Sequence, residues 1–272
     1  MQSNARRRHV APDTDMILYA TLFLGALLAS LLIYRYDLYE REPWPYLVAT
    51  ASVGMLTMWL AGTLEEISLG AISDHTFLHV ALVAATHEEG LRVAVVGLFA
   101  LLVPSQFNDP MDGLVYGSFL GIGMAVAESL DRMMYLPALP DMLPATEIVR
   151  VFGHLVLGGI VCFGIGLARM RVARWPWWLG GCVVFAVSWH FLWDWVAFTA
   201  SGSAALLPMQ NAVGVVLMAT GMVVYGVLVI MGSNESRRIF APCSQRELWG
   251  WPFTLWRGRP GPSRASRGAD AS

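Results

Sequence analysis

Seven apolar stretches of roughly twenty residues, separated by short polar or proline-containing segments, make up most of the sequence. An apolar helix of about twenty residues is long enough to cross the hydrocarbon core of a bilayer. The pattern therefore predicts an all-α, polytopic transmembrane bundle of about seven spans, with a range of six to eight. The predicted spans are residues 16–34, 45–64, 77–103, 112–130, 148–168, 177–199 and 205–231.

The composition agrees with a membrane protein. The chain is 56% hydrophobic and 14% charged, whereas a soluble domain carries about 25% charged residues. The net charge of −2 gives no basis for binding nucleic acid, so membrane lipids are the expected surroundings. The three cysteines show no C-x-x-C spacing, which argues against a zinc knuckle or a disulfide framework.

Arginine placement and local composition predict the domain organisation. Residues 1–15 form an N-terminal tail, residues 16–231 the transmembrane domain, and residues 232–272 an Arg-, Pro- and Gly-rich tail that we expect to be disordered. Residues 62–76 read as a polar connection or as a helix lying in the interface. More arginines fall on the side of the C-terminus, so the C-terminus is predicted to be cytoplasmic.

Several ionisable residues nevertheless lie inside the predicted spans. A charged group at the bilayer centre costs roughly 2.5–3.5 kcal/mol, so five such groups facing lipid would cost about 15 kcal/mol. They must instead face one another, water or a bound ion. These residues are Glu88, Glu89, Arg92, Glu128 and Asp194, joined by His154 and His190.

The segment EEGLR holds three of these charges on one helical face. Arg92 lies four residues after Glu88 and three after Glu89, so it can pair with either carboxylate but well with only one at a time. The unpaired carboxylate is then the candidate base. The alternative is a structural one, in which a buried ion pair holds two helices together. One Glu–Arg pair would be enough for that, so the second carboxylate argues against it.

Glycines and a carboxylate share a face of the next span. Gly113, Gly117 and Gly121 recur at intervals of four, a pattern that lets another backbone approach closely. Glu128 continues this stripe and is predicted to point into the bundle, unless it is a helix-terminal residue at the interface. Asp112 is predicted to cap the start of the helix.

Two histidines lie in separate later spans. His154 stands in a glycine-rich span and could simply be a satisfied buried polar group. His190 and Asp194 are four residues apart on one face, so Asp194 can fix the tautomer of His190, or both can point at one metal or water. His87 lies about 100° around the helix from Glu88 and is held in reserve.

These residues are suited to activating water. A buried glutamate can take a proton from water as a general base. The histidines could bind a metal that acidifies the water, or could stabilise an oxyanion. No serine stands in a G-x-S-x-G context, which disfavours a covalent route.

Four ordered motifs give the chain a resemblance to the PrsW family of membrane-embedded proteases, which is related to the CAAX prenyl endopeptidases. EEGLR resembles the family's E-E-x-x-K motif, and DGLVYGSFLGIGMAVAES resembles its D-G-x-x-Y-G-x-x-x-G…E-N motif. Gly153-His154 and HFLWD resemble the third motif and the H-x-x-x-D motif, and RYDLYEREPWPYL precedes them as a degenerate first segment. Arg92 replaces the usual lysine, and Ser129 replaces the usual asparagine.

The resemblance implies a bacterial intramembrane endopeptidase in the cytoplasmic membrane, acting on membrane-anchored proteins such as anti-sigma factors. Its site would hold Glu88, Glu89, His154, His190 and Asp194 as catalytic residues. Arg92, Glu128 and Asp112 would support them. The resemblance fits either a metalloprotease, with zinc on His154 and His190, or a glutamate protease without a ligated metal.

Two other functions use similar residues. A proton-coupled transporter also needs intramembrane Glu, Arg, His and Asp, but it often shows internal repeats, and no repeat is visible here. An inactive scaffold would bind membrane partners without chemistry, and the complete set of acids and histidines argues against it.

Overall fold

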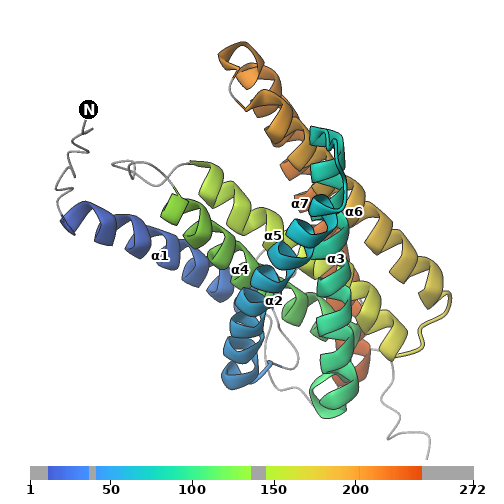
Figure 1. The fold of residues 1–272 in the computed structure, drawn as a ribbon. Coiled ribbons are helices and arrows are strands. Elements are labelled where there is room, and N and C mark those ends of the chain that lie inside the picture. Colours follow the sequence, from blue (N-terminus) through green and yellow to red (C-terminus); the bar gives the residue numbers. More distant parts are fainter. Residues whose placement is uncertain (1–11, 37–40, 136–144, 202, 241–272) are drawn as a thin grey trace, which may run out of the picture.

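The computed structural model describes residues 12–36, 41–135, 145–201 and 203–240, and this part of the chain forms a bundle of seven α-helices without strands (Figure 1). Short 3₁₀ turns, η1 (Pro104–Gln106) and η2 (Ala204–Leu206), lie between helices. The predicted all-α fold is confirmed. The helices are α1 (Pro12–Tyr36), α2 (Trp44–Gly70), α3 (Phe77–Leu102), α4 (Pro110–Tyr135), α5 (Ala145–Arg169), α6 (Trp175–Ala200) and α7 (Leu207–Phe240).

Helices α4 and α5 form the centre of the bundle. Their most apolar segments are 83% and 89% buried, whereas those of α1, α2, α6 and α7 are between 17% and 28% buried. The other helices therefore surround this pair and present most of their surface outward. The residues at the contact between α4 and α5 are consequently expected to have higher local stability than those on the outer helices.

The predicted glycine stripe is the reason why α4 and α5 lie so close together. A Cβ atom added at Gly117 would stand 2.2 Å from the carbonyl oxygen of Gly158, and one at Gly121 would stand 2.0 Å from that of His154. Gly113 makes a similar backbone contact further along α5. Any larger residue would force the helices apart, so glycine sets the position of the backbone that carries His154.

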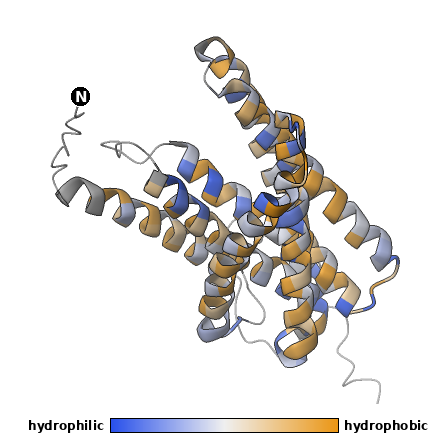
Figure 2. Cartoon of the chain, in the orientation of Figure 1, coloured by the Kyte–Doolittle hydropathy of each residue, from blue (hydrophilic) through white to orange (hydrophobic). Residues whose placement is uncertain are grey.

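The outward surface is that of a multi-pass membrane protein. Figure 2 shows apolar residues over the outer sides of the helices, and Leu56, Leu101 and Val215 are at least 67% exposed. Six helices of the described chain are long and apolar enough to cross a membrane. The seventh, α3, is similarly long but carries Glu88, Glu89 and Arg92.

Helices α2 and α7 extend furthest beyond the predicted spans. Helix α2 runs to Gly70, so the beginning of the expected connection at 62–76 is transmembrane helix instead. Its leucine and glutamate residues are good helix formers, and the helix ends at a glycine. Helix α7 continues to Phe240, past the expected boundary at 231, while residues 241–272 lie outside the described part of the chain.

Candidate active site

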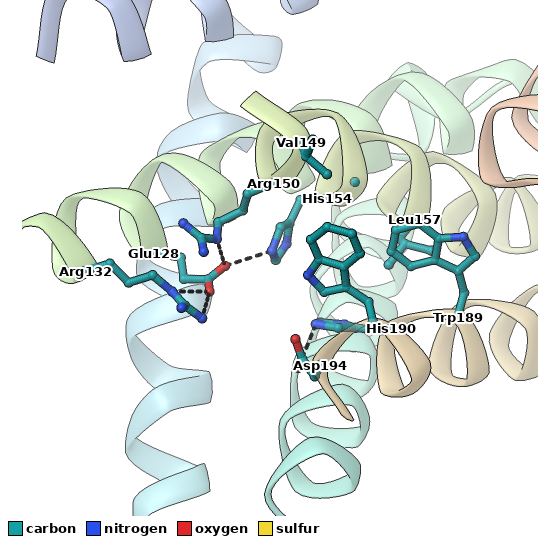
Figure 3. A pocket seen from close by; sticks show the side chains of 11 residues that line it. Glu128, Arg132, Val149, Arg150, His154, Leu157, Trp189, His190 and Asp194 are labelled. Atoms are coloured by element: carbon teal, nitrogen blue, oxygen red, sulfur yellow. Dashed lines mark hydrogen bonds and ion pairs between the residues drawn. The ribbon is translucent and has the colours of Figure 1, made fainter. Parts of the chain in front are cut away.

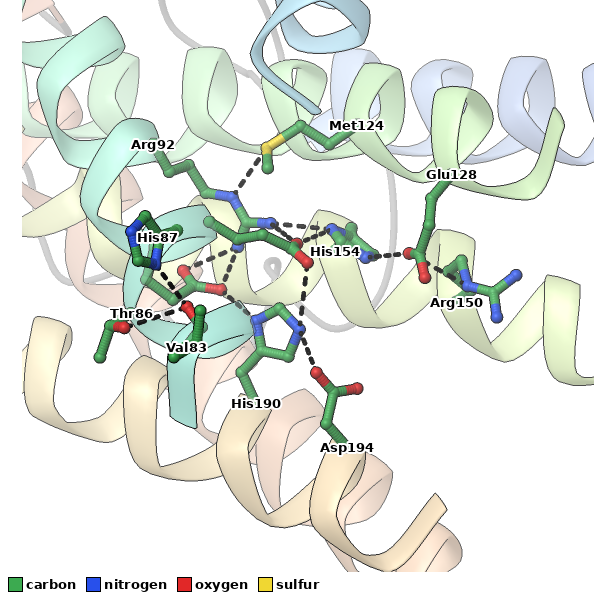
Figure 4. A network of polar contacts seen from close by, with 12 residues as sticks. Val83, Thr86, His87, Arg92, Met124, Glu128, Arg150, His154, His190 and Asp194 are labelled. Carbon is green, nitrogen blue, oxygen red and sulfur yellow. Dashed lines mark hydrogen bonds and ion pairs between the residues drawn. The ribbon is translucent and has the colours of Figure 1, made fainter. Parts of the chain in front are cut away.

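The ionisable residues predicted from separate spans meet in one buried polar centre (Figure 4). Helix α3 contributes Glu88, Glu89 and Arg92 from its buried face, and none of the three is more than 4% exposed. The other members come from three further helices: Glu128 of α4, His154 of α5, and His190 and Asp194 of α6. Four helices thus contribute to one cluster.

Arg92 binds Glu89 rather than Glu88. Its Nη1 atom donates to both carboxylate oxygens of Glu89, at 2.6 and 2.7 Å. The remaining guanidinium nitrogens donate to Met124 Sδ at 3.3 Å and to His154 Nδ1 at 2.8 Å. Because every nitrogen of Arg92 has a partner, the guanidinium is fixed and holds Glu89 in one orientation.

Glu88 is the carboxylate that remains open. Its Oε2 atom is buried and has no hydrogen-bond partner among the described residues. The nearest polar groups are too far for hydrogen bonds: Arg92 Nη2 at 4.0 Å and His154 Nδ1 at 3.8 Å from Oε2, and His190 Nε2 at 3.8 Å from Oε1. The Glu88 side chain also keeps 5% exposure, whereas that of Glu89 has none.

The two histidines differ in what their nitrogens do. His154 Nδ1 accepts from Arg92, so its Nε2 carries the proton and donates to Glu128 Oε2 at 3.0 Å. His190 Nδ1 donates to Glu89 Oε1 at 2.9 Å. His190 Nε2 faces Asp194 Oδ2 at 3.4 Å, a longer contact than the one from Nδ1.

Glu128 is held between two arginines. Arg132 Nη2 lies 2.8 Å from its Oε1 atom and Arg150 Nε lies 3.1 Å from its Oε2 atom. Arg150 also pairs with Glu147 at the start of α5. The prediction that Glu128 points into the bundle is confirmed, and its contacts make it an anchor for His154 rather than a free base.

A small cleft opens beside this centre (Figure 3). Its volume of about 30 Å³ has room for one or two water molecules. Polar walls come from His154, His190 and Asp194, and Trp189 and Trp193 of α6 form an apolar wall. Glu88 is not part of the lining, but its carboxylate lies 3.8 Å from His154 Nδ1 and 3.8 Å from His190 Nε2, and both of these residues line the cleft.

Sequence reasoning missed Glu65, which α2 brings toward the same centre. Its Oε1 atom is buried without a hydrogen-bond partner among the described residues. Its carboxylate interacts electrostatically with His190, Asp194 and Glu128. Glu65 fell in the segment expected to connect two spans, although it follows the buried Ala61 by one helical turn, and that spacing was the available signal.

Two other candidates lie away from the centre. His87 donates to the carbonyl oxygen of Val83 and contacts Ser68 of α2 at 3.1 Å, so it ties α3 to α2. Asp112 stands at the start of α4, sixteen residues before Glu128 and so roughly 24 Å from it along the helix. There Asp112 and Asp109 each accept the other's backbone N–H, a capping box that fits the predicted capping role.

The arrangement of donors does not fit a zinc ion held by both predicted histidines. The Nδ1 lone pair of His154 accepts a hydrogen bond from Arg92, and the Nε2–H of His154 donates to Glu128. His154 therefore has no lone pair for a metal. Within the described residues, no three His, Cys, Asp or Glu side chains are placed to hold a metal ion together.

The sequence is similar to proteins of one known family. The sequence model of the PrsW family intramembrane metalloprotease matches residues 42–230, which include every residue of the polar centre. The chain is 26% identical over 171 residues to Protease PrsW of Geobacillus kaustophilus (strain HTA426), covering 61% of this chain and 74% of that protein. No solved structure matches the chain. Because the family match spans most of the transmembrane bundle and the whole polar centre, the chain is an intramembrane peptidase and belongs to the PrsW family of intramembrane metalloproteases.

Proposed function

We propose that the protein hydrolyses peptide bonds of membrane-anchored proteins with a water molecule activated by Glu88. The observation that carries this proposal is the difference between two adjacent carboxylates. Glu89 accepts three hydrogen bonds from Arg92 and His190, whereas Glu88 Oε2 has no hydrogen-bond partner among the described residues. A base must be free to accept a proton, and Glu88 is the free member of the pair.

In the first step, a water molecule at the inner end of the cleft transfers a proton to Glu88. The oxygen of this water molecule attacks the carbonyl carbon of the scissile peptide bond, and the carbonyl oxygen becomes an oxyanion. His190 in its imidazolium form donates from Nδ1 to Glu89 and directs its Nε2–H toward the cleft, beside Asp194. We assign this N–H as the donor to the oxyanion.

In the second step, the tetrahedral intermediate collapses and the C–N bond breaks. Glu88 returns its proton to the departing amine, so the carboxylate is regenerated and one water molecule is consumed for each bond cleaved. Glu89 and Glu128 are positioning residues in this scheme. Glu89 holds His190 and Glu128 holds His154, through hydrogen bonds of 2.9 and 3.0 Å.

We propose a membrane orientation that is supported by the arginines at the helix ends. Arg35, Arg169, Arg171 and Arg174 lie at the end of the bundle where α7 ends. An excess of basic residues marks the cytoplasmic side, so we place the C-terminus in the cytoplasm of a bacterial cell. The cleft lies between the start of α5 and the last turns of α6, which are nearer the opposite face, so cleavage is proposed in the outer part of the bilayer.

The proposal is tested by reconstituting the purified protein in liposomes with single-span membrane proteins, including anti-sigma factors. We expect defined cleavage products, and a His190→Ala change should lower kcat by about 10²–10³-fold because one oxyanion donor is lost. The matched control is His87→Ala, which alters a histidine of the same membrane domain that faces α2. Equal cleavage by all three proteins would contradict the mechanism.

Removal of divalent metals provides a separate prediction. Because the lone pair of His154 is occupied by Arg92, we expect activity to survive treatment with 1,10-phenanthroline and dialysis. Metal content should be measured by mass spectrometry on the same liposomes before and after treatment. Stoichiometric zinc, together with a loss of activity that added zinc reverses, would require a rearranged site in which Arg92 releases His154.

A further inference from the structure

Two tryptophans of α6 separate the catalytic cleft from α7. The rings of Trp189 and Trp193 are stacked, with centroids 6.1 Å apart and planes 11° from parallel. Trp189 Nε1 donates to the carbonyl oxygen of Leu217 at 2.6 Å, so this ring ties α6 to α7. Trp193 is half-buried and lies on the apolar wall of the cleft.

A second, smaller crevice lies on the other side of Trp193. Its volume is about 10 Å³, and it is bounded by α6 and the first turns of α7. Its walls are mainly apolar, with one amide from Gln210. Trp193 lines both cavities, so its indole is a partition between them. The other walls of the crevice include Val196, Ala197, Val213 and Leu217.

The position of the Trp193 ring is set by a glycine of α7. A Cβ atom at Gly214 would stand 3.0 Å from Cζ3 of Trp193, a tighter contact than side chains normally accept. The absence of a side chain at this position therefore lets the ring lie against the α7 backbone. A methyl group there would move the ring by a few tenths of an ångström.

The contact between α6 and the first turns of α7 is also a candidate entrance for a substrate that arrives from the lipid, because it faces outward. The apolar segment of α7 is 17% buried and that of α6 is 28% buried, so both helices are largely outward-facing. A membrane-anchored substrate approaches from the lipid and carries apolar side chains. The crevice and the catalytic cleft share one wall, Trp193, and the apolar lining of the crevice suits such a side chain.

We propose that the substrate polypeptide enters between α6 and the start of α7, and that the crevice is the subsite for the side chain beside the scissile bond. Trp193 is then the specificity-determining residue. A volume of about 10 Å³ has room for roughly one water-sized group, so the subsite favours a methyl side chain and selects alanine over leucine or phenylalanine. This inference rests on the proposed peptidase function.

The first test compares substrates that carry Ala, Leu or Phe at the position next to the cleaved bond. Wild-type protein should cleave the alanine substrate best. Trp193→Ala should raise the Leu/Ala ratio of kcat/KM by about 10–100-fold, the usual effect of matching pocket size to side-chain size. Gly214→Ala should lower that ratio, whereas Gly226→Ala, whose added Cβ meets nothing within 4 Å, should leave it unchanged. An unchanged ratio in Trp193→Ala would overturn the assignment.

The second test does not depend on catalysis. A photo-cross-linking amino acid replaces Val213, which lines the crevice, in a Glu88→Gln background, and the control replaces Val215, which is 70% exposed at the same depth. We expect the alanine substrate to cross-link at Val213 and not at Val215. Cleavage by the wild type without cross-linking at Val213 would overturn the entry route alone. Cross-linking without any cleavage by the wild type would overturn the peptidase mechanism alone.

Discussion

Glu88→Gln is expected to abolish proteolysis without unfolding the protein. Glutamine keeps the size of the side chain but cannot accept the proton from water, so kcat should fall by about 10³–10⁴-fold. The free energy of unfolding should stay the same or rise slightly, because the change replaces a buried carboxylate oxygen that has no hydrogen-bond partner among the described residues. Cleavage in liposomes and unfolding in detergent measure the two quantities on the same preparation.

Glu89→Gln is the matched control for this prediction. It removes an equal charge one residue away, but it also breaks the pairing with Arg92 and weakens the bond from His190. We therefore expect Glu89→Gln to lower both stability and activity, in contrast to Glu88→Gln. If Glu89→Gln were inactive and fully stable while Glu88→Gln cleaved normally, the two carboxylates would have to exchange roles.

Arg92→Met is expected to cause the largest loss of stability. It leaves the fully buried Glu89 without its guanidinium, and breaking one partner of a buried ion pair costs about 3–5 kcal/mol. It also frees His154 Nδ1, so His154 loses one of its two fixed contacts. Activity should disappear together with the fold, as measured by circular dichroism and cleavage in the same liposomes.

A double change separates charge from packing at this position. Glu89→Gln combined with Arg92→Met removes both charges, so this double variant should be less destabilised than Arg92→Met alone. A double variant that is less stable than Arg92→Met by the full effect of Glu89→Gln would show that the two residues act independently.

A separate variant, Arg92→Lys, keeps the charge but loses the planar guanidinium. It should retain the pairing with Glu89 while losing the bond to His154.

The seven helices and the residues of the buried polar centre could be predicted from the sequence alone. The charge cost of a lipid-facing Glu88 or Arg92 already required the helices to meet around them, and the glycine interval already predicted the close approach of another backbone, which the structure identifies as α5. The choice between Glu88 and Glu89 could not be predicted, because both spacings permit pairing with Arg92. That choice depends on His154 and His190, which approach from other helices.

Glu65 shows a second limit of sequence reasoning. Two adjacent glutamates at the end of an apolar stretch are typical of a helix that has left the membrane, so the span was expected to end at 64. In the structure the helix continues to Gly70, and the Glu65 carboxylate reaches the electrostatic field of the polar centre. The helix-forming leucine and glutamate residues carry the helix on to Gly70, and an apolar-run criterion for a span does not register them.

The partners of Arg92 also constrain how the chain is made. Through its own bonds and those of Glu89, this residue joins α3 to α4, α5 and α6, and the last of these is synthesised about a hundred residues after Glu89. Until then Glu89 lacks the hydrogen bond from His190 that completes its contacts. In a nascent chain that stops before α6, we expect α3 to remain at the insertion machinery. The partners of Arg92 thus determine when α3 can enter the membrane during synthesis.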